Sequence, residues 1–160
     1  MIQLCQGDIL QSSADALVNT VNCVGVMGAG LALQFKRAYP EMFSGYTAAC
    51  GQGRIELGDV WVYWLSRPPA RPPHCIVGFP TKHHWRGQSK IENIESGLAA
   101  LTEFVYQLDI GSIAIPPLGC GLGGLAWNDV RPLIEKAFEG LPDVEVLLFE
   151  PRKCGVWEGK

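Results

Sequence analysis

Short apolar runs alternate with longer amphipathic segments along the chain. Strands are predicted where β-branched and apolar residues cluster: residues 16–21, 59–65, 75–79, 112–115 and 144–149. Helices are predicted where apolar side chains recur every three or four positions: residues 31–39, 40–50, 91–108 and 127–138. Because strands and helices alternate, the pattern predicts an α/β fold of three layers, in which a mixed, largely parallel sheet lies between helices.

Two local signals refine these elements. Asn128 is a residue type that caps helices, so it is predicted to cap the helix over 127–138. Residues 67–73 contain four prolines, which exclude helix and interior strand, so this stretch is predicted to be a stiff excursion between two strands.

The composition indicates one folded domain. The chain has 160 residues, of which 48% are hydrophobic and 18% charged, enough apolar surface to form a core and to argue against disorder. We expect residues 1–155 to form the domain and residues 156–160 to be a tail. No apolar stretch is long enough to span a membrane, and residues 1–5 lack the features of a signal peptide. We therefore expect a cytoplasmic protein with no membrane partner.

Charge and cysteine spacing narrow the chemistry. The formal net charge of -3 argues against a protein that coats nucleic acid non-specifically, although a local basic cleft is still possible. No two of the six cysteines are spaced like the ligands of a zinc site, and we expect them to be free thiols. No metal and no cofactor is predicted.

Glycine is enriched, at 19 of 160 residues, and it concentrates in two loops. Residues 22–30 and 116–124 each follow a predicted strand and lead towards a helix. Glycine lets the backbone bring N–H groups close to a ligand, and several such groups beside a helix N-terminus suit an anion. The loops match neither the P-loop pattern nor the dinucleotide fingerprint, which argues against a kinase or a Rossmann dehydrogenase. Together they are predicted to hold a diphosphate.

Asp8 follows Gly7, just past a first strand that is expected at the N-terminus, ahead of the strands given above. Its carboxylate is suited to accept a hydrogen bond from an exocyclic amine such as that of adenine. A turn-forming aspartate is the equally good alternative.

Taken in order, residues 7–9, residues 19–22 and the two glycine loops resemble the macrodomains, an αβα family that binds ADP-ribose. Residues 21–28, 79–86 and 116–125 are similar to its DarG branch, which is related to the human terminal ADP-ribose protein glycohydrolase. DarG macrodomains are antitoxins that remove ADP-ribose from thymine bases in DNA.

The resemblance implies a role for individual residues. Asp8 and Ile9 would hold adenine, Asn22 would bond the distal ribose, and the two glycine loops would hold the diphosphate. Phe149 would pack against adenine, unless it is simply a core residue. The full set of implied ADP-ribose contacts is Asp8, Ile9, Thr20, Val21, Asn22, Gly28, Gly30, Leu31, Thr81, Gly119, Cys120, Gly121, Leu122, Gly123 and Phe149.

Lys82 is the implied catalytic residue. Its amine could attack the anomeric carbon of the distal ribose and form a Schiff base, or it could act on water or on the leaving base. A solvated surface lysine is the alternative that composition alone favours. The next four residues form a basic and aromatic cluster predicted to contact DNA, as in single-strand binders: His83, His84, Trp85 and Arg86.

The leading functional prediction is therefore a hydrolase that removes ADP-ribose from thymine in single-stranded DNA and reverses the modification made by a DarT-type toxin. ADP-ribosylated DNA would be its substrate, ADP-ribose its product, and the toxin a partner if the natural chain has a further C-terminal region. One alternative is a reader module that binds ADP-ribose without cleavage. Another is a hydrolase of ADP-ribosylated protein carboxylates, but the protein-acting relative has an aspartate where this chain has Gly123.

Overall fold

The computed structural model describes residues 1–65 and 71–152 and contains one six-stranded sheet. Across the sheet, the strands are β1 (Ile2–Cys5), β6 (Glu145–Phe149), β5 (Ser112–Ile115), β2 (Ala16–Val21), β4 (Cys75–Pro80) and β3 (Trp61–Trp64). Every neighbouring pair is parallel except β3 and β4, which are antiparallel. The predicted mixed, largely parallel sheet is confirmed.

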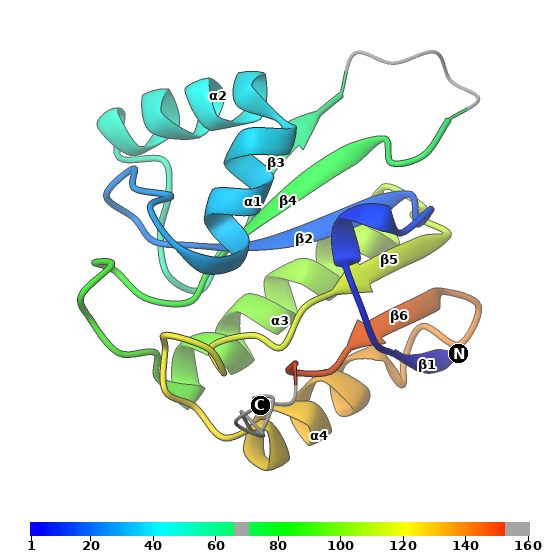
Figure 1. The fold of residues 1–160 in the computed structure, drawn as a ribbon. Coiled ribbons are helices and arrows are strands. Elements are labelled where there is room, and N and C mark those ends of the chain that lie inside the picture. The colour runs from blue at the N-terminus through cyan, green and yellow to red at the C-terminus, as the bar shows by residue number, and fades with distance from the viewer. Residues whose placement is uncertain (66–70, 153–160) are drawn as a thin grey trace, which may run out of the picture.

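Helices cover both faces of the sheet, as Figure 1 shows. One layer contains the 3₁₀-helix η1 (Ile9–Gln11), α1 (Gly30–Ala38) and α2 (Pro40–Gly51), and the other contains α3 (Ile91–Gln107) and α4 (Trp127–Phe138). Alternate side chains of β2 supply both cores: Ala16 and Val18 pack with α3 and α4, whereas Leu17 and Val21 pack with α1 and α2. This is the predicted three-layer αβα arrangement.

The start of α4 differs from its predicted capping. Ala126 occupies the N-cap position without a side-chain hydrogen bond, and Asn128 lies inside the first helical turn. Trp127, the first helical residue, packs against the core of the α3 and α4 layer. Asn128 thus lies two positions after the N-cap, and the prediction that Asn128 caps the helix is wrong.

Part of the predicted excursion over 67–73 and the predicted tail over 156–160 lie outside the described residues. The excursion falls between β3 and β4, as expected for a connection between two strands. Among the described residues, no helix is both long and apolar enough to cross a membrane.

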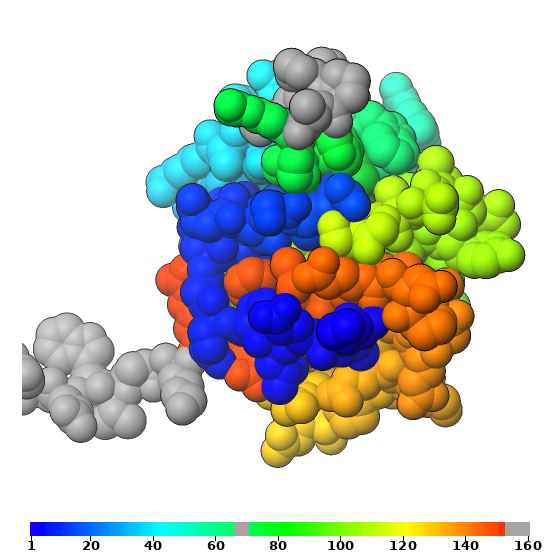
Figure 2. All heavy atoms as spheres, turned by 90° about the vertical axis from the view of Figure 1, so that its right-hand side faces the viewer, coloured from blue at the N-terminus to red at the C-terminus, as the bar shows by residue number. Residues whose placement is uncertain are grey.

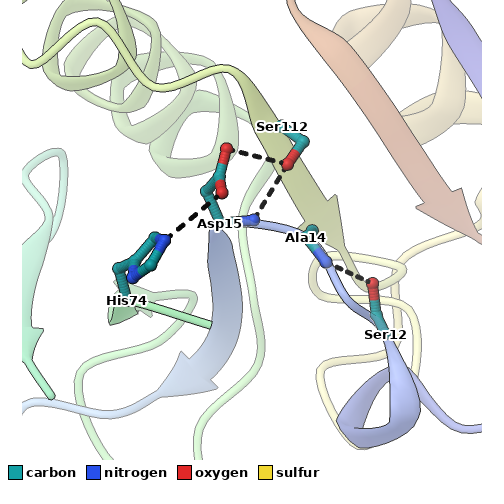
Figure 3. A network of polar contacts seen from close by, with 5 residues as sticks. All are labelled: Ser12, Ala14, Asp15, His74 and Ser112. Atoms are coloured by element: carbon teal, nitrogen blue, oxygen red, sulfur yellow. Dashed lines mark hydrogen bonds and ion pairs between the residues drawn. The ribbon is translucent and has the colours of Figure 1, made fainter. Parts of the chain in front are cut away.

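Polar contacts tie together the starts of the parallel strands. Asp15 accepts a hydrogen bond from the Ser112 hydroxyl at 3.0 Å and lies 3.6 Å from the His74 imidazole, linking the starts of β2, β5 and β4 (Figure 3). The Met1 amine donates to the Val144 carbonyl at 2.8 Å, so the N-terminal segment lies against the chain that enters β6 (Figure 2). The opposite edge, where the parallel strands end, carries the long loops on the left of Figure 1.

Candidate active site

A cavity of about 660 Å³ lies beyond the carboxyl ends of the parallel strands. Its walls come from the loops that follow β1, β6, β5, β2 and β4, which are neighbours in that order. Five neighbouring strands cover four spacings of about 4.8 Å, or roughly 19 Å. The cavity is therefore elongated across the sheet, and the volume is typical of a site for a small organic ligand.

The first glycine loop is shaped by the side chain of Asn22. This side chain is 5% exposed, and its Nδ2 donates to the Val26 carbonyl at 2.7 Å. Its Oδ1 accepts from the N–H groups of Val24 at 3.1 Å and Val26 at 3.3 Å. Asn22 also lines the cavity, and its second Nδ2 hydrogen has no acceptor among the described residues. Its contact with a ribose stays a prediction.

Tyr46 supports the same loop through hydrogen bonds to Asn22. Its buried hydroxyl lies 2.6 Å from the Asn22 carbonyl oxygen and 2.8 Å from Asn22 Oδ1. Burial, followed by the nearby Cys50 thiol, raises the pKa of the Tyr46 phenol. The phenol therefore stays protonated at neutral pH and donates to Asn22. The sequence analysis missed this residue because its helical spacing indicates only a core position.

The N-terminus of α1 contributes free main-chain N–H groups to the cavity wall. Ala29 is the N-cap, and its side chain makes no capping hydrogen bond. Within the described chain, the main-chain N–H groups of Gly30, Leu31 and Ala32 have no acceptor, and all three residues line the cavity. Free N–H groups at the positive end of a helix favour a bound anion.

The second glycine loop contributes a further set of free main-chain N–H groups. The Leu125 N–H donates to the Gly119 carbonyl at 2.9 Å and closes the loop. Gly119 has a φ of +72°, which favours glycine. The N–H groups of Gly121, Leu122 and Gly123 have no acceptor in the described parts of the chain, and these residues line the cavity. Successive free N–H groups make a second anion-binding concavity.

The end of the cavity near β1 and β6 contains the residues predicted to hold adenine. Asp8 Oδ1 accepts from the Leu10 N–H at 3.0 Å and caps η1, so Asp8 has the turn role as well as a place in the cavity wall. Phe149 is 8% exposed and belongs both to the core and to the wall. Sequence analysis missed Glu150 and Arg152, which also line this end. Their only sequence signal is their position after β6.

Lys82 lies at the other end of the cavity, after β4. Its side chain is half-buried, and no ion pair with its ammonium occurs among the described residues. Two main-chain bonds hold its segment: the Thr81 N–H donates to Val21 at 3.0 Å, and the Cys23 N–H donates to His83 at 2.8 Å. The other charged residues in the described wall come from the β1 and β6 end. Lys82 is therefore the one charged residue that the segment after β4 contributes to the described cavity wall.

Trp85 forms the rim next to Lys82. Its indole is 44% exposed and stacks on His84 with a centroid distance of 5.2 Å, and the Arg86 guanidinium lies 4.5 Å from the ring centroid. Trp85 lines the cavity, whereas His83, His84 and Arg86 do not. The rings and the guanidinium thus form a prearranged cationic and aromatic cluster, although contact with DNA stays a prediction.

Most residues predicted to contact the ligand are brought together by the fold. Every predicted ADP-ribose contact except Cys120 lines the cavity, as does Lys82. Cys120 is half-buried, and its thiol donates to the Leu118 carbonyl at 3.5 Å.

This fold and this cavity define the class of protein: the chain belongs to the macro domain family, whose model matches residues 18–134. The "DNA ADP-ribosyl glycohydrolase" of Mycobacterium tuberculosis is 48% identical over 151 residues, which cover 94% of this chain and 42% of the relative. This chain thus spans less than half the length of that curated relative.

Solved structures show the same relationship. The "Macrodomain of Mycobacterium tuberculosis DarG" matches with a TM-score of 0.91 at 48% identity, covering 94% of this chain and 98% of that one. "Thermosipho africanus DarTG in complex with ADP-ribose" matches with a TM-score of 0.88 at 35% identity, covering 94% of this chain and 42% of that one. The predicted resemblance to DarG macrodomains is confirmed.

Proposed function

We propose that this protein hydrolyses the N-glycosidic bond between ADP-ribose and thymine in single-stranded DNA, with Lys82 as the catalytic residue. The observation that carries the proposal is the order of groups along one cavity. Across five strands the cavity presents first the Asp8 carboxylate, which can accept a hydrogen bond from an amine. Two sets of free main-chain N–H groups follow, and Lys82 comes last. The order corresponds to adenine, diphosphate and distal ribose. The M. tuberculosis relative, named for this activity, supports it.

The reaction breaks the bond between the anomeric carbon and the thymine nitrogen. The bonding electron pair leaves with thymine, which takes up a proton, and water supplies the hydroxyl that the anomeric carbon gains. Lys82 can serve as the nucleophile, which forms a Schiff base that water then hydrolyses. It can instead act as an acid or base on the leaving thymine or on water. Borohydride trapping of a covalent adduct distinguishes these routes, because only the first contains a reducible imine.

Hydrolysis of ADP-ribosylated protein carboxylates is disfavoured by the second loop. A Cβ at position 123 would lie 2.2 Å from Ser89 Oγ and 2.6 Å from the Gly119 carbonyl oxygen. No side chain, and hence no carboxylate, fits there in this loop conformation. A mechanism that needs an acidic residue at this position therefore has no group to perform it.

The proposal extends to the biological setting. A DarT-type toxin is the proposed partner, and the DarTG chain from Thermosipho africanus supports this. The remaining length of the curated relatives, beyond the part matched here, is a candidate for the toxin contact. The cytoplasmic location predicted from the sequence belongs to the same proposal.

The test uses a thymidine oligonucleotide carrying ADP-ribose. Lys82→Ala should slow the release of ADP-ribose by about 100-fold or more, because a positioned acid or base accelerates a reaction by at least about that factor. Calorimetry should show that the variant still binds ADP-ribose. Lys136→Ala is the matched control, since this exposed lysine lies on α4 and outside the cavity wall.

Full activity of Lys82→Ala would contradict the catalytic assignment. If the wild-type protein binds ADP-ribose but releases none from the oligonucleotide, the reader function replaces the hydrolase. A protein substrate assayed in parallel tests the carboxylate alternative.

A further inference from the structure

Ser89 joins the segment that carries Lys82 to the second glycine loop. It lies seven positions after Lys82, just before α3, and its N–H donates to the Gly123 carbonyl at 3.0 Å. The residue is 6% exposed and does not line the cavity. Ser89 therefore packs against the second glycine loop without forming part of the cavity wall.

The Ser89 side chain fills a hollow made by two glycines. A Cβ at Gly123 would lie 2.2 Å from Ser89 Oγ, and a Cβ at Gly119 would lie 3.1 Å from Ser89 Cβ. Gly123 is not in the left-handed region, so its backbone conformation does not by itself demand glycine. The demand for glycine at 123 comes from the close approach of Ser89 and of the Gly119 carbonyl.

The Ser89 hydroxyl is buried without a hydrogen-bond partner in the described structure. A buried donor without a partner is unfavourable, so such a group calls for an explanation. The Gly119 carbonyl oxygen is an acceptor close to this hydroxyl. A Cβ added to Gly123 would lie 2.2 Å from Ser89 Oγ and 2.6 Å from the Gly119 oxygen, so the two oxygens border the same small space. The Gly119 oxygen accepts one bond from Leu125 and retains a second lone pair.

We propose that Ser89 is a positioning residue of the second glycine loop, whose hydroxyl donates to the Gly119 carbonyl when the loop tightens around the ligand's diphosphate. This inference rests on the proposed function. The free N–H groups of residues 121–123 would turn towards the phosphates, and the loop would move as one piece because Leu125 closes it onto Gly119. The absence of a side chain at Gly123 leaves the path between the two oxygens open. The bond therefore forms in the bound state and contributes to affinity.

The main test is Ser89→Ala, with Ser96→Ala as the matched control on the exposed face of α3. Calorimetry should show that Ser89→Ala raises the Kd for ADP-ribose about fivefold, the worth of one net hydrogen bond. KM for the ADP-ribosylated oligonucleotide should rise similarly, while kcat changes by less than about twofold. The Tm of the ligand-free protein should stay the same or rise, because a hydroxyl without a partner is removed.

A second variant tests whether the space between Ser89 Oγ and the Gly119 carbonyl oxygen must stay open. In Gly123→Ala the new methyl group would clash with both Ser89 Oγ and the Gly119 oxygen, so the loop must shift and the same bond cannot form. Because Ser89→Ala removes the closer of the two clashes and the bond is already lost, the double variant should bind ADP-ribose no more weakly than Gly123→Ala alone. Multiplication of the two single effects would overturn the inference.

Two further results would also overturn it: an unchanged Kd in Ser89→Ala, or a higher Kd with a Tm that falls in parallel, as expected for a merely structural serine. Failure of the wild-type protein to bind ADP-ribose or to cleave the oligonucleotide refutes the proposed function instead. The two failures are thus distinguished by the wild-type measurement.

Discussion

Gly97 determines how closely α3 approaches the strand that leads to Lys82. A Cβ at this position would lie 2.4 Å from Cζ and 2.8 Å from Cε1 of Phe79, a fully buried ring on β4. Carbon atoms in contact are normally about 3.5–4.0 Å apart. The substitution Gly97→Ala therefore forces the ring or the helix to move by about 1 Å.

Two opposing contributions determine the size of the effect. Alanine favours a helix over glycine by about 1 kcal/mol. Overpacking a buried contact costs about 1–3 kcal/mol, and an overlap of more than 1 Å with an aromatic ring places this site near the upper figure. The free energy of unfolding should then fall by about 2 kcal/mol. For a domain of this size the Tm should drop by about 4–8 °C.

Denaturant titration and thermal unfolding of Gly97→Ala measure this loss. Gly51→Ala is the matched control, because this glycine ends α2 and a Cβ added there would meet no atom within 4 Å apart from its own neighbouring helix backbone. The substitution should therefore not lower stability. Replacing Phe79 by leucine in the Gly97→Ala background should recover part of the loss, since the clashing ring atoms are removed. A Gly97→Ala protein as stable as wild type would refute the reasoning about close approach.

Two other predictions concern buried polar groups. Tyr46→Phe removes the hydroxyl that supports Asn22, so chemical denaturation should show a loss of about 1 kcal/mol, whereas Tyr106→Phe, at a side chain 69% exposed, should show none. Burial, followed by Asp15, raises the pKa of the Cys75 thiol from 9.0 to about 12. Above pH 9 the unfolded chain loses this proton while the folded protein keeps it, so stability should decline with rising pH by up to about 1.4 kcal/mol per unit. Reducing-buffer titrations at pH 8 to 10 should show a shallower decline for Cys75→Ala, and an identical slope would contradict the assignment.

The elements were predictable wherever burial leaves a periodic pattern. The predicted helix over 127–138 and strand over 112–115 have the bounds observed for α4 and β5, because one face of each is wholly apolar. Periodicity fails for η1, whose three residues are too few to repeat a pattern. The periodic pattern also did not indicate that the N-cap of α4 is Ala126, with Trp127 as the first helical residue and Asn128 already within the helix.

The site was predictable only in part, because some of its groups depend on distant partners. Motif residues such as Asn22 and Lys82 stand out in the sequence and line the cavity. Tyr46 has the spacing of a core residue, and its hydroxyl becomes functional only where α2 brings it to Asn22, 24 positions earlier. Ser89 carries no motif, and its close approach to Gly119 and Gly123 arises only when the second loop folds against it.

The excess of glycine and the low charge of the chain have one physical explanation. A diphosphate held by basic side chains would place those cations close to the ribose, where they would compete with Lys82 for charge and space. Main-chain N–H groups from α1 and residues 121–123 are suited to bind an anion without adding a titratable group. Glycine is what permits that backbone approach, and at Gly123 it also leaves room for Ser89. Affinity for the diphosphate can therefore rest on the backbone, which under the proposed function leaves Lys82 for the chemistry.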